Sequence, residues 1–393
     1  MNKYIILTVL AKIPRLIIRP MLQPLLPVIA TTLMVTTHEA KYVWLALTIG
    51  FLIANIYLCG WGDRTTIKPI FVIVLPIAII GTSLSMIANI YCIQCGVFCI
   101  AFGANVVATL GPILLREIDQ QNAQESIAIN STISEFAPII FLVITGALIS
   151  YNWRYIFLTL FIIFLITWIL ALYTPELPRN FALDQSKLWQ RGKTILLNKK
   201  YLALLLLFIS YLAIMSIIFV VLPFTAINFF HIPAHIFSYL LIPSYILQVF
   251  GSYLCFKLHK RLSITSFISF VLFCSLCGLI LFLLFNFLPI PIIYIIIFGT
   301  GAYCFGVGMI FPYLNAKIIL LVDDSISLTA DALFGILYAL VSIVAVILAT
   351  HLNDHNSLQF AVLALGFFSC AVIGAIIYCK LECTQNTTIL KTK

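Results

Sequence analysis

Long apolar runs separated by short polar breaks fill the sequence from Tyr4 to Cys379. A run of about 20 apolar residues is long enough to cross a bilayer as a helix. In lipid the backbone must satisfy its own hydrogen bonds, and within one continuous run only a helix does so. The sequence therefore predicts an all-α integral membrane protein. We predict twelve spans, at residues 4–35, 42–60, 69–90, 93–116, 127–150, 154–173, 201–228, 236–256, 264–287, 291–320, 326–350 and 358–379.

The composition excludes a soluble protein. Of the 393 residues, 63% are hydrophobic and 9% are charged, whereas soluble domains carry roughly 25% charged residues. The net charge of +9 does not indicate a nucleic-acid partner, because the cations lie in short breaks between spans rather than in one patch. Most of the 11 cysteines lie inside apolar runs, where cysteine behaves as a small hydrophobic residue. We predict a lipid bilayer around the chain, and neither a metal nor a cofactor.

The distribution of Lys and Arg predicts the orientation of the chain. Cytoplasmic loops of membrane proteins carry an excess of these residues. With the N-terminus inside, only Lys41 and Arg154 of the 22 Lys and Arg residues fall in predicted outer loops, and most of the others fall in inner segments. An even number of spans then places both termini in the cytoplasm. We expect a multi-pass protein of the cell inner membrane.

One inner segment, residues 174–200, is polar, charged and much longer than the others. It divides the predicted spans into two equal sets, as in transporters that are built from repeated halves packed around a central path. We therefore predict two six-helix bundles, at residues 1–173 and 201–380, joined by a cytoplasmic loop at 174–200 and followed by a cytoplasmic tail at 381–393.

Short motifs lie at or near the predicted helix ends, at Gln23–Pro27, Gly62–Pro69, Gly111–Arg116, Asn152–Phe157, Gly306–Pro312 and Ala330–Gly335. In their order and placement they resemble the major facilitator superfamily, and within it the bicyclomycin-resistance branch of drug–proton antiporters. The Gly-Asp-Arg sequence that begins at Gly62 is similar to the signature loop that follows the second span in this family. The resemblance implies the major facilitator fold and a secondary transporter.

The chain departs from these antiporters in several places, among them Cys59, which stands where the signature loop has its earlier Gly. Ile67 stands where the signature loop has its central Gly, and Arg19 with Pro20 stands where the branch has an acid in its first span. The fourth span carries no charge between Gly96 and Thr109, where many antiporters have an Arg. Family membership alone does not determine the substrate, so the candidate site must be argued from its own residues.

The first predicted span carries Lys12, Arg15 and Arg19 at spacings i, i+3 and i+7, and Gln23 continues the same helical face. Charges inside a membrane are costly and are usually functional. A cationic face on a central path would bind an anionic substrate, and Arg can grip a carboxylate or phosphate with two hydrogen bonds. The alternative is that the span begins near Pro20 and that the three cations anchor the inner face of the membrane.

Two acids lie inside predicted spans and are candidates for proton coupling. Glu135 lies in the fifth span and Asp331 in the eleventh. A carboxyl group in a low-dielectric setting can exchange a proton near neutral pH. The alternative for Glu135 is a structural pair with a buried cation, of which Arg19 is one candidate.

Three charged residues after the second span, Asp63, Arg64 and Lys68, are candidates for gating. Asp63 can lie against the positive N-terminal end of a helix or pair with a nearby cation, which would hold the cytoplasmic side closed. Ordinary positive-inside charge is the alternative, and it accounts for Lys68 but not for Asp63.

These residues favour a secondary transporter that moves a small, anionic metabolite, such as a polycarboxylate or a siderophore, by alternating access, with proton coupling as one option. Multidrug efflux by proton antiport is the alternative that the family resemblance and the 31 phenylalanines favour. An integral-membrane enzyme would need His, Asp or Glu residues clustered at one membrane face, and the sequence has no such cluster. We expect a monomer without enzymatic activity.

Overall fold

The computed structural model describes residues 2–61, 66–118, 123–173, 198–284, 287–288, 291–320, 327–352 and 357–391. All regular structure in these ranges is helical. Ten helices of this described part are long and apolar enough to cross a membrane, and Ile133–Ile149 is a shorter apolar stretch. The predicted all-α membrane fold is therefore confirmed.

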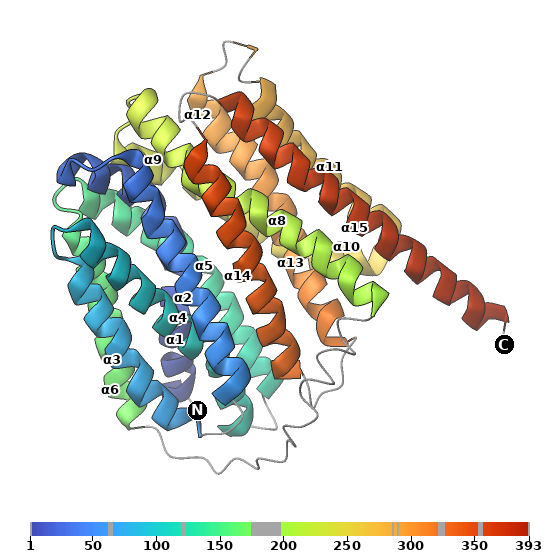
Figure 1. Cartoon of the computed structure of the whole chain (residues 1–393). Coiled ribbons are helices and arrows are strands. Elements are labelled where there is room, and N and C mark those ends of the chain that lie inside the picture. Colours follow the sequence, from blue (N-terminus) through green and yellow to red (C-terminus); the bar gives the residue numbers. More distant parts are fainter. Residues whose placement is uncertain are drawn as a thin grey trace. The chain divides into compact units, whose positions relative to one another are not determined.

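The first half of the chain forms one helix at each predicted span (Figure 1). The observed ends lie within a few residues of the predicted ones, because the length of each apolar run decides the length of its helix. The helices are α1 (Asn2–Leu33), α2 (Thr37–Trp61), α3 (Ile67–Ser85), α4 (Ile90–Ile118), α5 (Ala123–Ile149) and α6 (Arg154–Leu172).

In the second half, several predicted spans are divided into shorter elements. The seventh continues from an α-helix into a π-helix, the eighth is divided at Leu241, and the tenth contains a second π-helix. The last helix runs through most of the predicted tail. The elements are α8 (Lys199–Phe224), η1 (Thr225–Phe229), α9 (Ala234–Leu240), α10 (Ile242–Arg261), α11 (Ile264–Leu284), α12 (Ile292–Tyr294), η2 (Ile295–Gly299), α13 (Thr300–Leu320), α14 (Ser327–His351) and α15 (Ser357–Lys391).

The beginning of α2 corrects one prediction. Lys41 was expected in an outer loop, but the helix begins at Thr37 and Lys41 is only 1% exposed. The reason is a capping box: the backbone N–H of Thr36 donates to Glu39 Oε2 at 2.9 Å, and the N–H of Glu39 donates to Thr36 Oγ1 at 3.2 Å. This Thr-x-x-Glu pattern starts the helix one turn before the apolar run begins.

The chain forms two compact units. Unit 1 comprises Met1–Leu183 with Leu222–Tyr239, and unit 2 comprises Asp184–Val221 with Leu240–Lys393. In unit 1, α4 packs against α1, α2 and α3, and α3 lies beside α6 (Figure 1). In unit 2, α13 packs against α10 and α11, and α11 packs against α15.

Small residues allow the closest of these helix contacts. A Cβ atom added to Gly308 on α13 would lie 2.0 Å from the carbonyl oxygen of Gln248 on α10, and one added to Gly50 on α2 would lie 2.6 Å from that of Phe98 on α4. Real Cβ atoms do not come this close to a backbone oxygen, so both contacts need glycine. Such packing of small residues is typical of helices in membranes.

Candidate functional site

The predicted cationic face lies in the body of α1, which is continuous from Asn2 to Leu33 although it contains four prolines. The helix therefore does not begin at Pro20. Arg15 is exposed, Lys12 and Arg19 are half-buried, and Gln23 is fully buried. The packing of α1 against α2, α4 and α5 brings neutral and acidic groups of unit 1 to this face.

Two of the cations contact neutral groups of neighbouring helices. Arg15 Nη1 donates a hydrogen bond to Thr109 Oγ1 of α4 at 3.3 Å. The guanidinium carbon of Arg19 lies 4.9 Å from the centre of the Phe51 ring of α2, a distance at which the ring face attracts a cation. The two arginines are thus oriented toward α4 and α2, while each keeps its positive charge.

The third cation lies near the acid that was predicted for proton coupling. The opposite charges of Lys12 on α1 and Glu135 on α5 attract each other, whereas the like charge of Arg15 repels Lys12. Both members of the Lys12–Glu135 pair are half-buried. The sequence did not predict this pair, because it named Arg19 as a candidate partner of Glu135.

A polar contact one turn away sets the register of this pair. Asn130 Nδ2 on α5 donates to Thr8 Oγ1 on α1 at 2.7 Å, and Asn130 is buried. Lys12 lies four residues beyond Thr8, and Glu135 lies five residues beyond Asn130. Two helices that run in the same direction rise by about 6 Å and 7.5 Å over these distances. The Thr8–Asn130 hydrogen bond therefore places Lys12 and Glu135 at the same level.

Sequence reasoning missed both Asn130 and a second buried amide pair in unit 1. Asn105 Nδ2 on α4 donates to Asn55 Oδ1 on α2 at 3.0 Å, and both residues are buried. Asn55 lies one turn beyond Phe51, which contacts Arg19. The only sequence signal was an amide inside an apolar run, where a buried polar side chain needs a partner.

Of the other predicted site residues, only some lie in the part of the chain that the structure describes. Asp63 and Arg64 lie outside the described residues. Lys68 lies in the first turn of α3 and is half-buried. Asp331 lies in the second turn of α14, and its side chain is outside the described part. The gating role of Asp63, Arg64 and Lys68 and the coupling role of Asp331 remain predictions.

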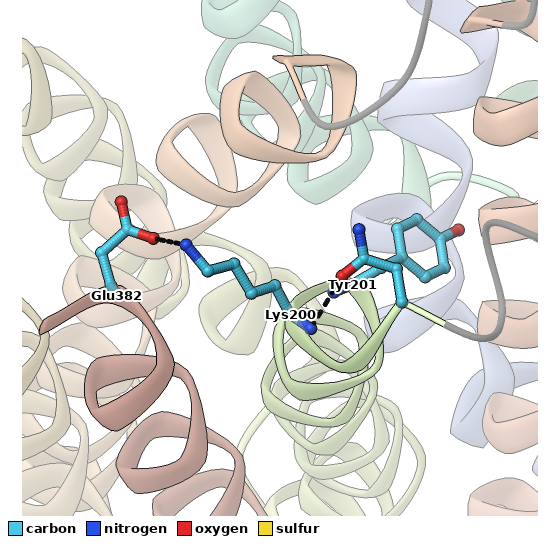
Figure 2. Close-up of polar contacts among 4 residues, drawn as sticks. Lys200, Tyr201 and Glu382 are labelled. Carbon is cyan, nitrogen blue, oxygen red and sulfur yellow. Dashed lines mark hydrogen bonds and ion pairs between the residues drawn. The ribbon is translucent and has the colours of Figure 1, made fainter. Parts of the chain in front are cut away.

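Unit 2 holds an ion pair that the sequence did not indicate. Figure 2 shows Lys200, at the beginning of α8, extending to Glu382 on α15. Lys200 Nζ lies 2.5 Å from Glu382 Oε2, and the two side chains are only 17% and 21% exposed. Asn198 Oδ1 accepts hydrogen bonds from the backbone N–H groups of Lys200 and Tyr201, at 3.0 and 3.4 Å. These hydrogen bonds cap the N-terminal end of α8. The pair therefore joins the capped end of α8 to α15.

A family model described as the Major Facilitator Superfamily matches residues 10–345. The chain belongs to this superfamily. It is a multi-pass membrane protein and a secondary transporter of a small molecule rather than an enzyme, as predicted. A comparison with curated protein sequences gives no match.

Solved structures of transporters share the fold of this superfamily member. A D-xylose–proton symporter has a TM-score of 0.73 at 14% identity, covering 96% of this chain and 97% of that one. The nucleoside transporter NupG has a TM-score of 0.72 at 13% identity, covering 96% and 99%. A structure described as a proton-dependent oligopeptide transporter has a TM-score of 0.71 at 14% identity, covering 96% and 98%. At these identities the similarity shows the major facilitator fold, which confirms the predicted fold class.

Proposed function

We propose that this transporter moves a small anionic metabolite, polycarboxylate- or siderophore-like, and that the cationic face of α1 binds its charge. The observation that carries the proposal is the concentration of Lys12, Arg15 and Arg19 on one face of α1, with Glu135 beside Lys12. Glu135 is the only acid in the six spans predicted for the first half. An anionic substrate would balance the excess of positive charge.

The Lys12–Glu135 pair supplies a route to proton coupling. When an anionic group of the substrate binds Lys12, it competes with Glu135 for the same ammonium group. Glu135 then loses the cation that favours its charged form and takes up a proton from the accessible side. The proton and the substrate cross together, and Glu135 returns to Lys12 after both are released. The proposal therefore predicts symport of an anion with a proton.

The test is uptake by purified protein in liposomes. A panel of labelled di- and tricarboxylates and a ferric siderophore is offered with and without an inwardly directed proton gradient. We expect Glu135→Gln to abolish the stimulation by the gradient while exchange of substrate for substrate continues. Thr145→Val is the matched control, because Thr145 is a buried, uncharged polar residue of α5 that lies ten residues beyond Glu135. Stimulation by the gradient that persists in the Glu135→Gln variant removes Glu135 from the coupling mechanism.

Multidrug efflux remains the second candidate, because unit 2 contains an aromatic cluster suited to apolar molecules. The Phe208 ring lies 4.7 Å from that of Phe311 and 4.2 Å from that of Phe334, which joins α8, α13 and α14. The resemblance to the bicyclomycin-resistance branch supports the same candidate. Efflux of cationic or neutral drugs that is unaffected by Arg19→Gln would favour this function over anion transport.

We further propose an inner-membrane location, cytoplasmic termini and a monomeric protein, and we retain the two-bundle division at residues 173 and 201. The positive-inside distribution of Lys and Arg supports the orientation. Reporter fusions after Lys193 and Lys260 should be cytoplasmic, and fusions after His38 and Asp354 should be periplasmic. One reversed reporter among these fusions contradicts the twelve-span topology.

A further inference from the structure

Two thiols lie one turn apart at the beginning of α4. Cys92 is the third residue of this helix and Cys95 is the sixth. A spacing of three residues places both side chains on one face of the helix, about 60° apart. Cys95 is exposed and Cys92 is half-buried, so a small molecule reaches the sulfur atom of Cys95 from outside the protein. Neither thiol takes part in the transport mechanism proposed above.

Hydrogen bonds fix the backbone that carries the two cysteines. Asn89 precedes α4, and its Oδ1 accepts a hydrogen bond from the backbone N–H of Cys92 at 3.3 Å. Between the two cysteines, Gln94 Nε2 donates to the carbonyl oxygen of Glu39 at 3.3 Å, which ties α4 to the beginning of α2. Residues 87–89, which precede the helix, are exposed. The pair therefore lies in the first two turns of a helix that begins at an exposed turn and is fixed there.

A third cysteine on the same face of α4, Cys99, is placed differently. A Cβ atom added to Gly81 of α3 would lie 2.7 Å from the Cβ atom of Cys99, so Cys99 packs against α3. Of the cysteines that the structure describes, only Cys92, Cys95 and Cys99 lie in unit 1. The partner of Cys95 within this unit is therefore either Cys92 or Cys99.

Helix geometry favours Cys92 as the partner of Cys95. On a regular helix, Cα atoms three residues apart are separated by about 5 Å, and disulfides join Cα atoms about 4.4–6.8 Å apart. The Cβ atoms of such a pair are about 5–6 Å apart and must approach to about 4 Å. A 3₁₀ turn, which is frequent at the beginning of a helix, supplies this tightening. Cys95 and Cys99 are four residues apart in the body of α4, where the α-helical hydrogen bonds oppose the same change.

We propose that Cys92 and Cys95 form a thiol–disulfide exchange site, which a small-molecule disulfide such as oxidised glutathione converts into a disulfide within α4. The thiolate of the exposed Cys95 attacks one sulfur atom of the reagent, forms a mixed disulfide and releases the first glutathione thiolate. The thiolate of Cys92 then attacks Cys95 Sγ, forms the protein disulfide and releases the second glutathione thiolate. The two protons lost by the cysteines pass to the two released thiolates. Two protein thiols are thus oxidised and one glutathione disulfide is reduced.

The proposed orientation of the chain explains how the site meets an oxidant. In the twelve-span topology, the turn between α3 and α4 lies on the outer side of the membrane. Disulfides form and persist in compartments outside the cytoplasm. The exchange chemistry itself depends neither on this orientation nor on the charge of the transported substrate.

The test is thiol mapping of the purified full-length chain in detergent, with every cysteine in place. The protein is equilibrated in glutathione buffers that range from fully reduced to fully oxidised. Free thiols are then alkylated after an acid quench, and the α4 peptide is measured by mass spectrometry before and after reduction. We expect Cys92 and Cys95 to escape alkylation together, in a peptide that is two hydrogen atoms lighter than its reduced form. Separate glutathione adducts on both cysteines, or two free thiols in the fully oxidised buffer, would overturn the proposal.

Two matched variants separate the roles of the cysteines. Cys92→Ser removes the second thiolate, so we expect at least tenfold more glutathione bound to Cys95 than in the parent. Cys99→Ser is the control, and we expect it to form the Cys92–Cys95 disulfide as the parent does. The pair is contradicted if Cys92→Ser carries no more glutathione than the parent, or if Cys99→Ser prevents the disulfide.

Discussion

Removing both members of the Lys12–Glu135 pair should destabilise the protein by less than the sum of the two single removals. Glu135→Gln leaves the Lys12 ammonium group half-buried beside Arg15, and Lys12→Gln leaves the half-buried Glu135 carboxylate without the Lys12 ammonium group. The double variant leaves neither charge. Its loss of stability should therefore be smaller than the sum of the two single losses.

The burial of the two residues limits the size of this coupling. Exposed ion pairs contribute about 0–1 kcal/mol, and removing one partner of a fully buried pair costs about 3–5 kcal/mol. Both side chains are half-buried, so we expect a coupling free energy of about 1–3 kcal/mol, within the range of contacting residues. At roughly 2–4 °C per kcal/mol, this coupling corresponds to about 2–12 °C in unfolding temperature.

The assay is thermal unfolding in detergent of the parent, the two single variants and the double variant. A second cycle of Arg19→Gln with Glu135→Gln serves as the control, because Arg19 lies over the Phe51 ring of α2 and the cation that acts on Glu135 is Lys12. We expect the control cycle to be additive within about 0.5 kcal/mol. Additive losses for Lys12 and Glu135 would show that the two charges do not form an energetic pair, and the coupling mechanism would lose its basis.

Two further predictions concern contacts in unit 2. Glu382→Gln should lower the unfolding temperature by about 2–8 °C, because it removes a charge-assisted hydrogen bond of about 1–2 kcal/mol from a mostly buried pair. Lys199→Gln, at an exposed neighbour, is the control. Equal unfolding temperatures of the two variants would count against the pair. Gly308→Ala should destabilise by about 1–3 kcal/mol, because its Cβ would lie 2.0 Å from the Gln248 carbonyl oxygen, whereas Gly366→Ala should not, because nothing lies within 4 Å of it; similar effects of the two substitutions would show that the α10–α13 contact is not tight.

The helices of this protein follow from its hydrophobic runs, because lipid leaves an apolar run of this length no other structure. The predictions were wrong where the boundary or the type of a helix depends on local hydrogen bonds, which the hydropathy of the run does not reveal. The Thr36–Glu39 capping box brought Lys41 into α2, and the π-helices were predicted as ordinary parts of their spans.

At the candidate site, the sequence predicted which residues share a helical face but not which residues of other helices contact them. The spacing of Lys12, Arg15 and Arg19 predicted one helical face, because the period of an α-helix fixes it. The partners of that face come from other helices, and their choice depends on packing. Thr8 with Asn130 is separated by 122 residues, and Lys200 with Glu382 by 182. No pattern in a single sequence links residues at such distances.

The central claim is that the α1 cations bind an anionic substrate, and the most direct measurement is the affinity for that substrate in liposomes containing Arg19→Gln. We predict that the apparent affinity falls at least tenfold, which corresponds to about 1.4 kcal/mol. Arg19→Lys should restore only part of it, because a point charge cannot reproduce the guanidinium fork. Anion transport by Arg19→Gln with unchanged affinity would contradict the claim and would identify Lys12, Arg15 and Arg19 as membrane anchors.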